Sequence, residues 1–355
     1  MRFTSFRSFA LALAFGALVV TTESARAGYV TFGSGFGSKW DDPNHGTPAI
    51  VTWGYMDDLT TLDPSHPMYA EVSGGSDIST MRADFDATYG AEAFESAIED
   101  AFDAWELVAN ILFVGPMPDS GLPSGSTGAT DPDIRIGAFT PVPSSGFSFV
   151  GAVGFGPPGD DLNYPDALAG DILFNIEAGF IMPSGAEDDP IMEFGNDLQN
   201  LTMHELGHAA MGLGHPSDGP GEVMYVGAGC CDFINRIPSA DDITGAQIVY
   251  GEPAPEGDVD LDGDVDFQDF LALQVGYGIT SDAIRTDGDL DDDGDVDFQD
   301  FLVLQANYGN DQDSARDGPS DLDVAAAVPE PSTLVLAVVG LLSGLIACRR
   351  CRGAR

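Results

Sequence analysis

Basic residues are scarce in this chain of 355 residues, which has 13 Lys and Arg against 58 Asp and Glu and a formal net charge of −45 at pH 7. Nucleic acids and anionic membrane surfaces bind through clustered positive charge, so the composition argues against both as partners. The carboxylates instead suit divalent cations, above all calcium, because hard cations prefer oxygen ligands. Hydrophobic residues make up 43% of the chain, enough for one large domain with smaller pieces beside it.

Cysteine is also rare. Of the four cysteines, Cys230 and Cys231 are adjacent, and Cys348 and Cys351 lie near the C-terminal end. Such a set cannot form the framework of a disulfide-rich domain, although the sequence leaves a bridge between the adjacent pair open. No cysteine precedes residue 230, which excludes a thiolate from an upstream pro-segment as a metal ligand.

No apolar run reaches the roughly 20 residues that a membrane-spanning helix needs. The N-terminal run from Phe9 to Val20 has 12 residues, follows Arg2 and Arg7, and precedes the A-x-A sequence at 25–27. These features predict that residues 1–27 are a secretory signal peptide and that the exported chain begins near residue 28.

The strongest chemical pattern is His204-Glu205-Leu206-Gly207-His208, which is followed by a third histidine, His215. Residues four apart lie one above the other on a helix, so His204 and His208 can present two imidazoles to one metal ion. Glu205 is close enough to hold a water molecule on that ion and to take its proton. The pattern therefore predicts two zinc ligands and a general base.

Residues 28–251 are predicted to form one domain of mixed α and β structure. Strands are predicted over residues 49–55, 133–139 and 171–176, and Gly/Pro/Ser-rich loops over 115–132 and 140–165. Apolar residues at helical spacing predict a helix over 91–109. We expect the histidine helix to begin near Asp197 and to end before Pro216, and a last helix to run from Ser239 to Gly251.

In this order the segments resemble a metzincin metalloprotease, most closely of the matrixin branch. The resemblance covers most of residues 39–251, and its parts are Lys39-Trp40, the 91–109 helix, Asp133 to Ile136, Gly170 to Asn175, the histidine motif, Met224-Tyr225 and Asp241 to Gly251. It implies an α+β fold, with a twisted mixed sheet over an active-site helix. It also implies a zinc endopeptidase with one catalytic zinc on three histidines, Glu205 as general base and Met224 as an apolar floor. The strand Asp171–Asn175 would be an edge strand that pairs with the extended substrate.

The spacing of the third histidine departs from the matrixin pattern. The family sequence H-E-x-x-H-x-x-G-x-x-H places it ten residues after the first, but His215 follows His204 by eleven. We expect the extra residue to be absorbed either by a π-bulge within 209–211 or by a looser turn over 212–214.

The sequence therefore leaves several candidates for the third zinc ligand. In order of preference they are His215, Asp218, and then His45 and His66. A second departure concerns the additional, structural zinc that matrixins bind. Leu173 stands where they carry a zinc-binding histidine, and Asn175 replaces an acidic residue, so we expect ordinary strand residues and no structural zinc here.

A Pro-rich linker over 252–255 leads into an acidic region over 256–310. Its sequence from Gly257 to Leu271 returns with a period of 31 from Gly288 to Leu302. In each copy carboxylates fall at positions 1, 3, 5, 9 and 12 of a loop with glycine at position 6, as in a 12-residue calcium loop, and the residue at position 7 adds a backbone carbonyl. The predicted calcium ligands are Asp258, Asp260, Asp262, Asp264, Asp266 and Asp269 in the first loop, and Asp289, Asp291, Asp293, Asp295, Asp297 and Asp300 in the second.

An apolar helix follows each loop, and the pair resembles a type I dockerin. This resemblance implies a small all-α module of two EF-hand-type units that binds two calcium ions and a cohesin-like or other cell-surface partner. Dockerins often carry Ser or Thr at loop positions 10 and 11, where this chain has Phe267-Gln268 and Phe298-Gln299. A stabilising or spacing role is the alternative.

The C-terminal segments have a different composition. Residues 311–328 are predicted to be a disordered linker. Residues 329–355 contain Pro-Glu-Pro, a short apolar run from Leu334 to Ala347 and a basic end. This resembles a PEP-CTERM sorting signal, which implies transient membrane association and processing by an exosortase-type enzyme, with the basic end kept cytoplasmic.

The sequence thus predicts an exported zinc endopeptidase, extracellular or at the cell surface, that hydrolyses peptide bonds in proteins. The rival hypothesis is a catalytically degenerate structural or adhesive surface protein that uses the calcium module for attachment. The extra residue before His215 and the expected lack of a structural zinc favour the rival. The retained Glu205 argues against it, because a scaffold has no need of that carboxylate.

Overall fold

The computed structural model describes residues 30–31, 39–61, 72–73, 76–124, 128, 131–142, 150–159, 168–187, 189–191, 195–216, 221–225 and 233–312. The chain divides into two compact units, 1–309 and 310–355, and only 310–312 of the second are described. The predicted signal peptide and sorting segment therefore lie outside the described residues. Among the residues that are described, no helix has the length and apolar character to cross a membrane. The predicted boundary at 252–255 stays a prediction.

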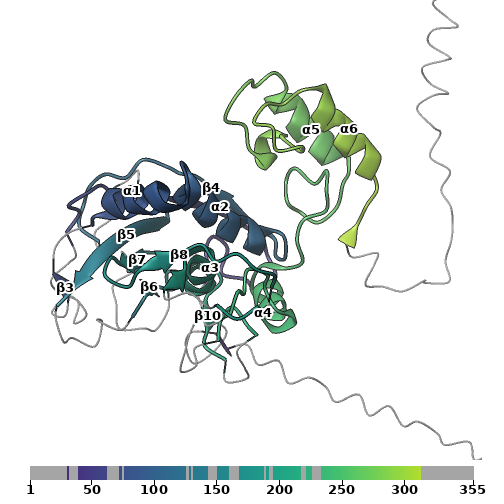
Figure 1. Ribbon diagram of the computed structural model, residues 1–355. Helices are drawn as coiled ribbons and strands as arrows, with labels where there is room; N and C mark the ends of the chain where they lie inside the picture. Colours follow the sequence, from purple (N-terminus) through teal and green to yellow (C-terminus); the bar gives the residue numbers. More distant parts are fainter. Residues whose placement is uncertain are drawn as a thin grey trace, which may run out of the picture. The chain divides into compact units, whose positions relative to one another are not determined.

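A mixed sheet forms the centre of the α/β part (Figure 1). Its strands are β2 (Ala49–Tyr55), β3 (Val72–Ser73), β4 (Ile111–Val114), β5 (Ile134–Pro141), β6 (Ala152–Gly154) and β7 (Ile172–Asn175). They lie in the order β4-β2-β5-β7-β6, and β3 pairs with the end of β5. Strands β4, β2, β5 and β7 are parallel, whereas β6 is antiparallel to β7. Because β5 and β7 are buried along almost their whole length, they read as apolar runs.

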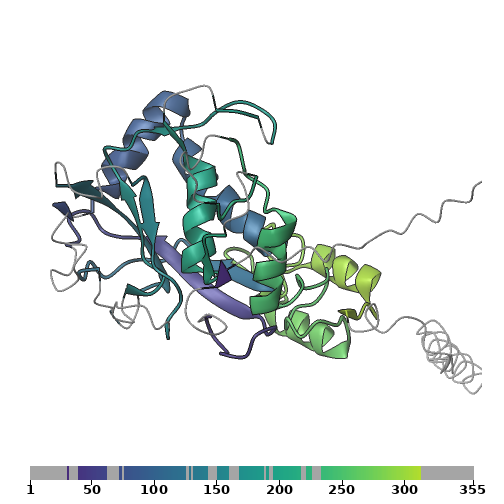
Figure 2. The ribbon, with the colours of Figure 1, turned by 90° about the horizontal axis from the view of Figure 1, so that it is seen from below.

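Four helices accompany the sheet, namely α1 (Ile78–Tyr89), α2 (Ala93–Glu106), α3 (Leu198–Ala209) and α4 (Ala240–Tyr250). The helix expected over 91–109 is present as α2. Its apolar stripe is buried, and Phe102 stacks on Trp53 of β2 with ring centroids 4.6 Å apart. The indole of Trp105 donates to the carbonyl of Met203 at 3.0 Å and so joins α2 to α3. Figures 1 and 2 show α2 and α3 beside the sheet.

Two short strand pairs flank α3. Strand β8 (Phe180–Ile181) pairs in parallel with β9 (Asn196–Asp197) just before the helix. Strand β1 (Val30–Thr31) pairs antiparallel with β10 (Leu213–Gly214) just after it. Both ends of α3 are thus joined to backbone from distant parts of the chain.

Two expectations about the sheet were wrong. The segment 140–165 contains strand β6, where only loop was expected. The strand over 171–176 is present as β7, but β7 lies between β5 and β6, so β6 is the edge strand next to it. A three-residue strand in a Gly/Pro/Ser-rich stretch carries no periodic signal, and its pairing with β7 defines it. Helix α1 and strand β4 were not predicted.

The acidic repeat folds as α5 (Phe267–Gly276), the 3₁₀ turn η4 (Arg285–Asp287) and α6 (Phe298–Asn307). Both α-helices start with a capping box, Asp266 with Asp269 and Asp297 with Asp300. A small core lies between the two loop–helix copies of the repeat. Its buried members are Val259, Val265, Leu273, Ala283, Val296 and Leu304. The repeat of the sequence is therefore a repeat of the structure.

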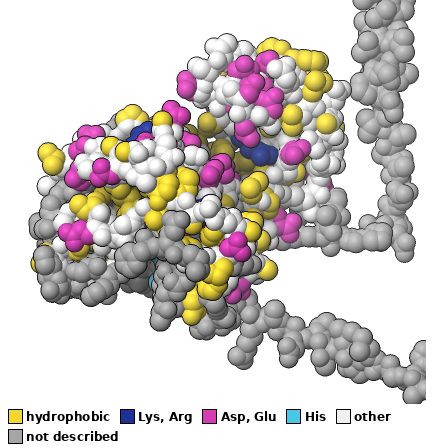
Figure 3. All heavy atoms as spheres, viewed as in Figure 1, with side chains coloured by type: hydrophobic (Ala, Val, Ile, Leu, Met, Phe, Trp, Pro, Cys, Tyr) yellow, Lys and Arg dark blue, Asp and Glu magenta, His cyan; other side chains and the backbone are white. Residues whose placement is uncertain are grey.

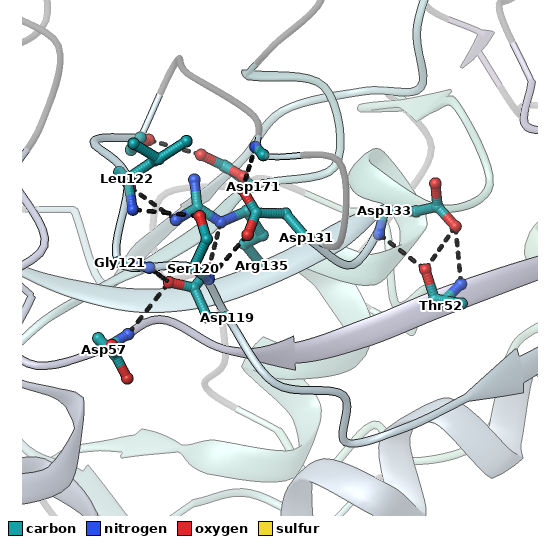
Figure 4. A network of polar contacts seen from close by, with 12 residues as sticks. Thr52, Asp57, Asp119, Ser120, Gly121, Leu122, Asp131, Asp133, Arg135 and Asp171 are labelled. Atoms are coloured by element: carbon teal, nitrogen blue, oxygen red, sulfur yellow. Dashed lines mark hydrogen bonds and ion pairs between the residues drawn. The ribbon is translucent and has the colours of Figure 1, made fainter.

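A buried ion pair anchors the loop between β4 and β5 (Figure 4). Arg135 of β5 donates to Asp119 at 2.6 Å and to the carbonyl of Leu122 at 2.8 Å. The hydroxyl of Ser124 donates at 2.5 Å to Asp171, directly before β7. Burial raises the pKa of Asp171 to about 7, although the guanidinium of Arg135 and the Ser124 hydroxyl oppose the rise.

We predict that Asp171→Asn raises stability more at pH 8 than at pH 5. Between its ordinary pKa of 3.8 and about 7, the Asp171 carboxyl holds its proton only in the folded chain. The free energy of unfolding therefore falls as the pH rises through this window, by up to about 1.4 kcal/mol per pH unit. An amide does not titrate and still accepts from Ser124. Urea unfolding at both pH values, with exposed Asp100→Asn as control, measures this, and a pH-independent gain would contradict it.

Candidate metal centre

Helix α3 begins where the sequence predicts, at Asp197. The Asp197 carboxylate accepts from the backbone N–H of Asn200 and caps the first turn. Arg236, from the segment before α4, donates to both oxygens of the same carboxylate at 2.9 and 3.1 Å. The bidentate pair fixes the start of α3 against the segment that follows the Met224 turn.

Three imidazoles converge at the other end of α3. His204 and His208 lie one turn apart on the helix, and His215 follows β10. The Nε2 atom of His215 lies 3.0 Å from Nε2 of His204 and 2.8 Å from Nε2 of His208. Tetrahedral zinc with nitrogen ligands at about 2.0–2.1 Å needs donors only slightly farther apart. His215 is exposed, whereas the other two are buried.

Backbone carbonyls set the orientation of the two helical imidazoles. Nδ1 of His204 lies 2.6 Å from the carbonyl of Val223, and Nδ1 of His208 lies 2.7 Å from that of Leu213. Since a carbonyl only accepts, each Nδ1 carries the proton, and each Nε2 is left unprotonated and faces Nε2 of His215. Burial lowers the pKa of His204 to about 4 and that of His208 well below its usual range. Neutral imidazoles with converging lone pairs repel one another, and a cation between them removes that cost, so the donor set fits zinc.

The extra residue is taken up at the end of α3. The N–H groups of Ala210 and Met211 both donate to the carbonyl of Leu206, at 2.7 and 3.1 Å. The second bond spans five residues and is of π type, as one of the two expected solutions requires. Gly212 then donates to His208 at 3.2 Å and leaves the helix at φ +64°, a left-handed conformation that favours glycine.

Two aromatic side chains cap this exit. The indole of Trp40 donates to the carbonyl of Ala209 at 2.9 Å, and the hydroxyl of Tyr250 donates to that of Ala210 at 2.7 Å. The backbone N–H of Trp40 donates in turn to the Tyr250 hydroxyl at 3.2 Å. Both carbonyls lie in the final turn, where they lack helical partners. The sequence analysis identified Trp40 and Tyr250 only as parts of the matrixin resemblance and predicted no role for either at the helix end.

The Met224 turn packs directly beneath the helix. A Cβ added to Gly207 would lie 2.0 Å from Sδ of Met224, so only glycine fits opposite the sulfur. Asp242 accepts from the N–H groups of Val223 and Met224 at 3.0 and 3.3 Å. The carboxylate thereby holds the carbonyl that orients His204. Sequence reasoning identified Asp242 only as a capping residue, because its second role joins segments distant in the chain.

Glu205 lies beside the edge strand. It is buried at 5% exposure, and a Cβ on Gly154 of β6 would lie 2.6 Å from its backbone oxygen and 3.1 Å from its Oε2. The helix and β6 can approach this closely because residue 154 has no side chain. The edge strand that lies next to Glu205 is thus β6.

The remaining predicted residues that the structure describes do not join this centre. Leu173 is buried in the core, and Asn175 donates to the carbonyl of Val150 at 2.8 Å, so both serve the sheet. His45 belongs to none of the groups of potential metal ligands among the described residues. Two candidates for the third zinc ligand, Asp218 and His66, lie outside the described residues, as does the pair Cys230 and Cys231, between which the sequence leaves a bridge open.

The two acidic loops have matching hydrogen bonds. Asp258 accepts from Gly263, and Asp289 accepts from Gly294, each at 2.9 Å. Both glycines have positive φ, at +97° and +83°, which the sharp turn of a calcium loop requires. At the end of the first loop, Asp269 accepts from Val259 and Asp266 at 2.6 and 2.7 Å.

Buried carboxylate oxygens point into both loops. Asp258 and Asp289 are 0% and 3% exposed, and among the described atoms the Oδ1 of each has no hydrogen-bond partner. Burial and neighbouring carboxylates raise the pKa of Asp258 and that of Asp260 to about 6. The carboxylates of the two loops form groups, each of which could hold one ion. In the first loop the groups are Asp258, Asp260 and Asp262, and Asp264, Asp266 and Asp269; in the second they are Asp289, Asp291 and Asp300, and Asp295, Asp297 and Asp300. Asp293 joins no such group.

Comparison with known families agrees with this geometry. Residues 79–251 match the family model of the matrixins. Residues 327–350 match the PEP-CTERM protein-sorting motif, which confirms the predicted sorting segment. The matrixin match supports a metalloprotease of α+β fold and implies a catalytic zinc. It ends before the acidic repeat.

Curated relatives match the same part of the chain. Matrix metalloproteinase-16 from Homo sapiens and that from Mus musculus are each 32% identical over 165 residues, or 44% of this chain and 24% of the relative. The protein from Rattus norvegicus matches equally. The chain thus covers about a quarter of the length of these relatives.

We predict that His215→Ala weakens zinc binding by more than the roughly 10–100-fold that loss of an outer hydrogen-bond partner costs. Asp218→Ala should bind zinc as the parent does, because His215 already lies within contact distance of the other two Nε2 atoms. Competition with a chromophoric chelator measures both affinities. Parent-like binding by His215→Ala, with loss in Asp218→Ala, would assign the third position to Asp218.

Proposed function

We propose that the protein is an exported zinc endopeptidase. The observation that carries the proposal is the convergence of three neutral imidazoles beside a glutamate and the edge of a sheet. A zinc ion on His204, His208 and His215 would supply a Lewis acid that polarises a peptide carbonyl and lowers the pKa of water. The matrixin match supports the assignment, and the sorting motif supports export with exosortase processing.

Each residue of the site has a definite part in the proposal. The free backbone edge of β6 pairs with an extended peptide by strand addition. Glu205, directly below that edge, takes a proton from water and passes it to the leaving amine. The carbonyls of Val223 and Leu213 keep the imidazoles in the tautomer that leaves Nε2 free. Met224 supports the helix from below and ligates nothing.

The decisive variant is Glu205→Gln. The amide preserves the shape of the side chain but cannot accept the proton, so we expect zinc to stay bound while hydrolysis falls by about 10²–10⁴-fold. Casein or gelatin cleavage and zinc content are measured together, with exposed Glu99→Gln on α2 as a matched control that retains both. If Glu205→Gln keeps more than a few per cent of the parental activity, the mechanism is wrong. If the parent holds zinc and cleaves nothing, the degenerate surface protein becomes the better description.

We also propose that the acidic repeat binds two calcium ions in a dockerin-like manner. Support comes from the buried Oδ1 atoms of Asp258 and Asp289, which lie at equivalent positions of two loops with the same backbone pattern. Calcium would relieve the mutual repulsion of the carboxylates and join each loop to the helix after it. A surface partner such as a cohesin would then meet a preformed module.

Calcium titration of the chelator-treated protein should show two bound ions. We expect Asp258→Asn and Asp289→Asn each to lose one of them, because each removes a buried ligand charge. Asp292→Asn is the matched control, since position 4 of the second loop is not a ligand position. Isothermal titration calorimetry counts the ions. Two full sites in Asp258→Asn would contradict the assignment of that loop.

A further inference from the structure

Each basic side chain between residues 28 and 310 already makes a hydrogen bond or an ion pair within the chain. Between residues 28 and 310 there are only five, and the structure describes all of them. The pairs are Lys39 with the carbonyls of Trp40 and Pro48, Arg82 with Glu95, Arg135 with Asp119, Arg236 with Asp197, and Arg285 with the carbonyls of Pro255 and Asp258. A substrate carboxylate therefore finds no unengaged guanidinium or ammonium group in this part of the chain.

Negative charge dominates the exposed surface instead. In Figure 3 acidic side chains appear in many places, and dark blue marks only small spots. One exposed carboxylate, that of Glu177, belongs to the segment that holds the start of the edge strand β6. Glu177 donates its backbone N–H to Asn175, whose side chain binds the carbonyl of Val150 just before the edge strand β6.

We propose that the site selects cationic polypeptides, with Lys or Arg near the scissile bond, and discriminates against acidic ones. The inference rests on the proposed peptidase function and names its substrate class. An acidic substrate meets repulsion without a compensating cation, whereas a basic one is attracted over about a Debye length of 8–10 Å. The selection is thus both attractive and repulsive, as specific recognition commonly is.

The test uses two fluorogenic peptides with one central sequence, flanked by Lys in one and by Glu in the other. We expect kcat/KM to be at least about tenfold higher for the Lys-flanked peptide at low salt, and the ratio to shrink at 0.5 M salt. Glu177→Lys should lower this ratio, whereas Asp100→Lys, on the exposed side of α2, should leave it near the parental value. Equal kcat/KM values for the two peptides would overturn the proposal.

Binding to Glu205→Gln protein, followed by fluorescence anisotropy, separates this inference from the peptidase function. If neither peptide is cleaved by the parent, the peptidase function fails, and the binding ratio still decides the charge preference. A salt-sensitive preference for the Lys-flanked peptide supports the inference. Indifferent binding, or tighter binding of the Glu-flanked peptide, overturns it.

Discussion

Three converging imidazoles, with Nε2 of His215 within about 3 Å of Nε2 of both His204 and His208, are the constraint on which the rest of the fold depends. Their lone pairs repel, and burial prevents His204 and His208 from relieving the repulsion by taking up a proton. The surrounding structure therefore has to impose this geometry. Asp242 fixes the turn whose carbonyl orients His204, and the backbone at Leu213 orients His208. The same contacts would hold the imidazoles in place around a bound metal ion.

The extra residue after His208 shows how a site of three histidines can tolerate a changed spacing. A π-type hydrogen bond to Leu206 absorbs the residue inside the last turn, so the helix still ends at a left-handed glycine. Trp40 and Tyr250, from opposite ends of the domain, bind the two carbonyls of that turn. The departure that favoured a degenerate protein is thus accommodated within one turn, and His215 still reaches the other two imidazoles.

The sequence was informative where the signal is local. The helix start at Asp197, the stripe of α2 and the two loops of the acidic repeat follow from periodicity and capping rules that act over a few residues. Strand β6 was missed because its three residues owe their conformation to β7, and helix α1 because its buried stripe is narrow, with only Ile78, Met81 and Phe85. The second role of Asp242 joins residues 18 and 19 positions apart, and no local pattern encodes it.

The proposed peptidase activity depends on zinc. Zinc content and peptidase activity should therefore be measured on the same purified protein, before chelation, after it and after zinc is restored. We expect one zinc ion per chain, loss of activity with the ion and recovery with it, while calcium alone restores nothing. Full activity in protein without zinc would contradict the account, as would a stoichiometric zinc site that supports no cleavage of any polypeptide.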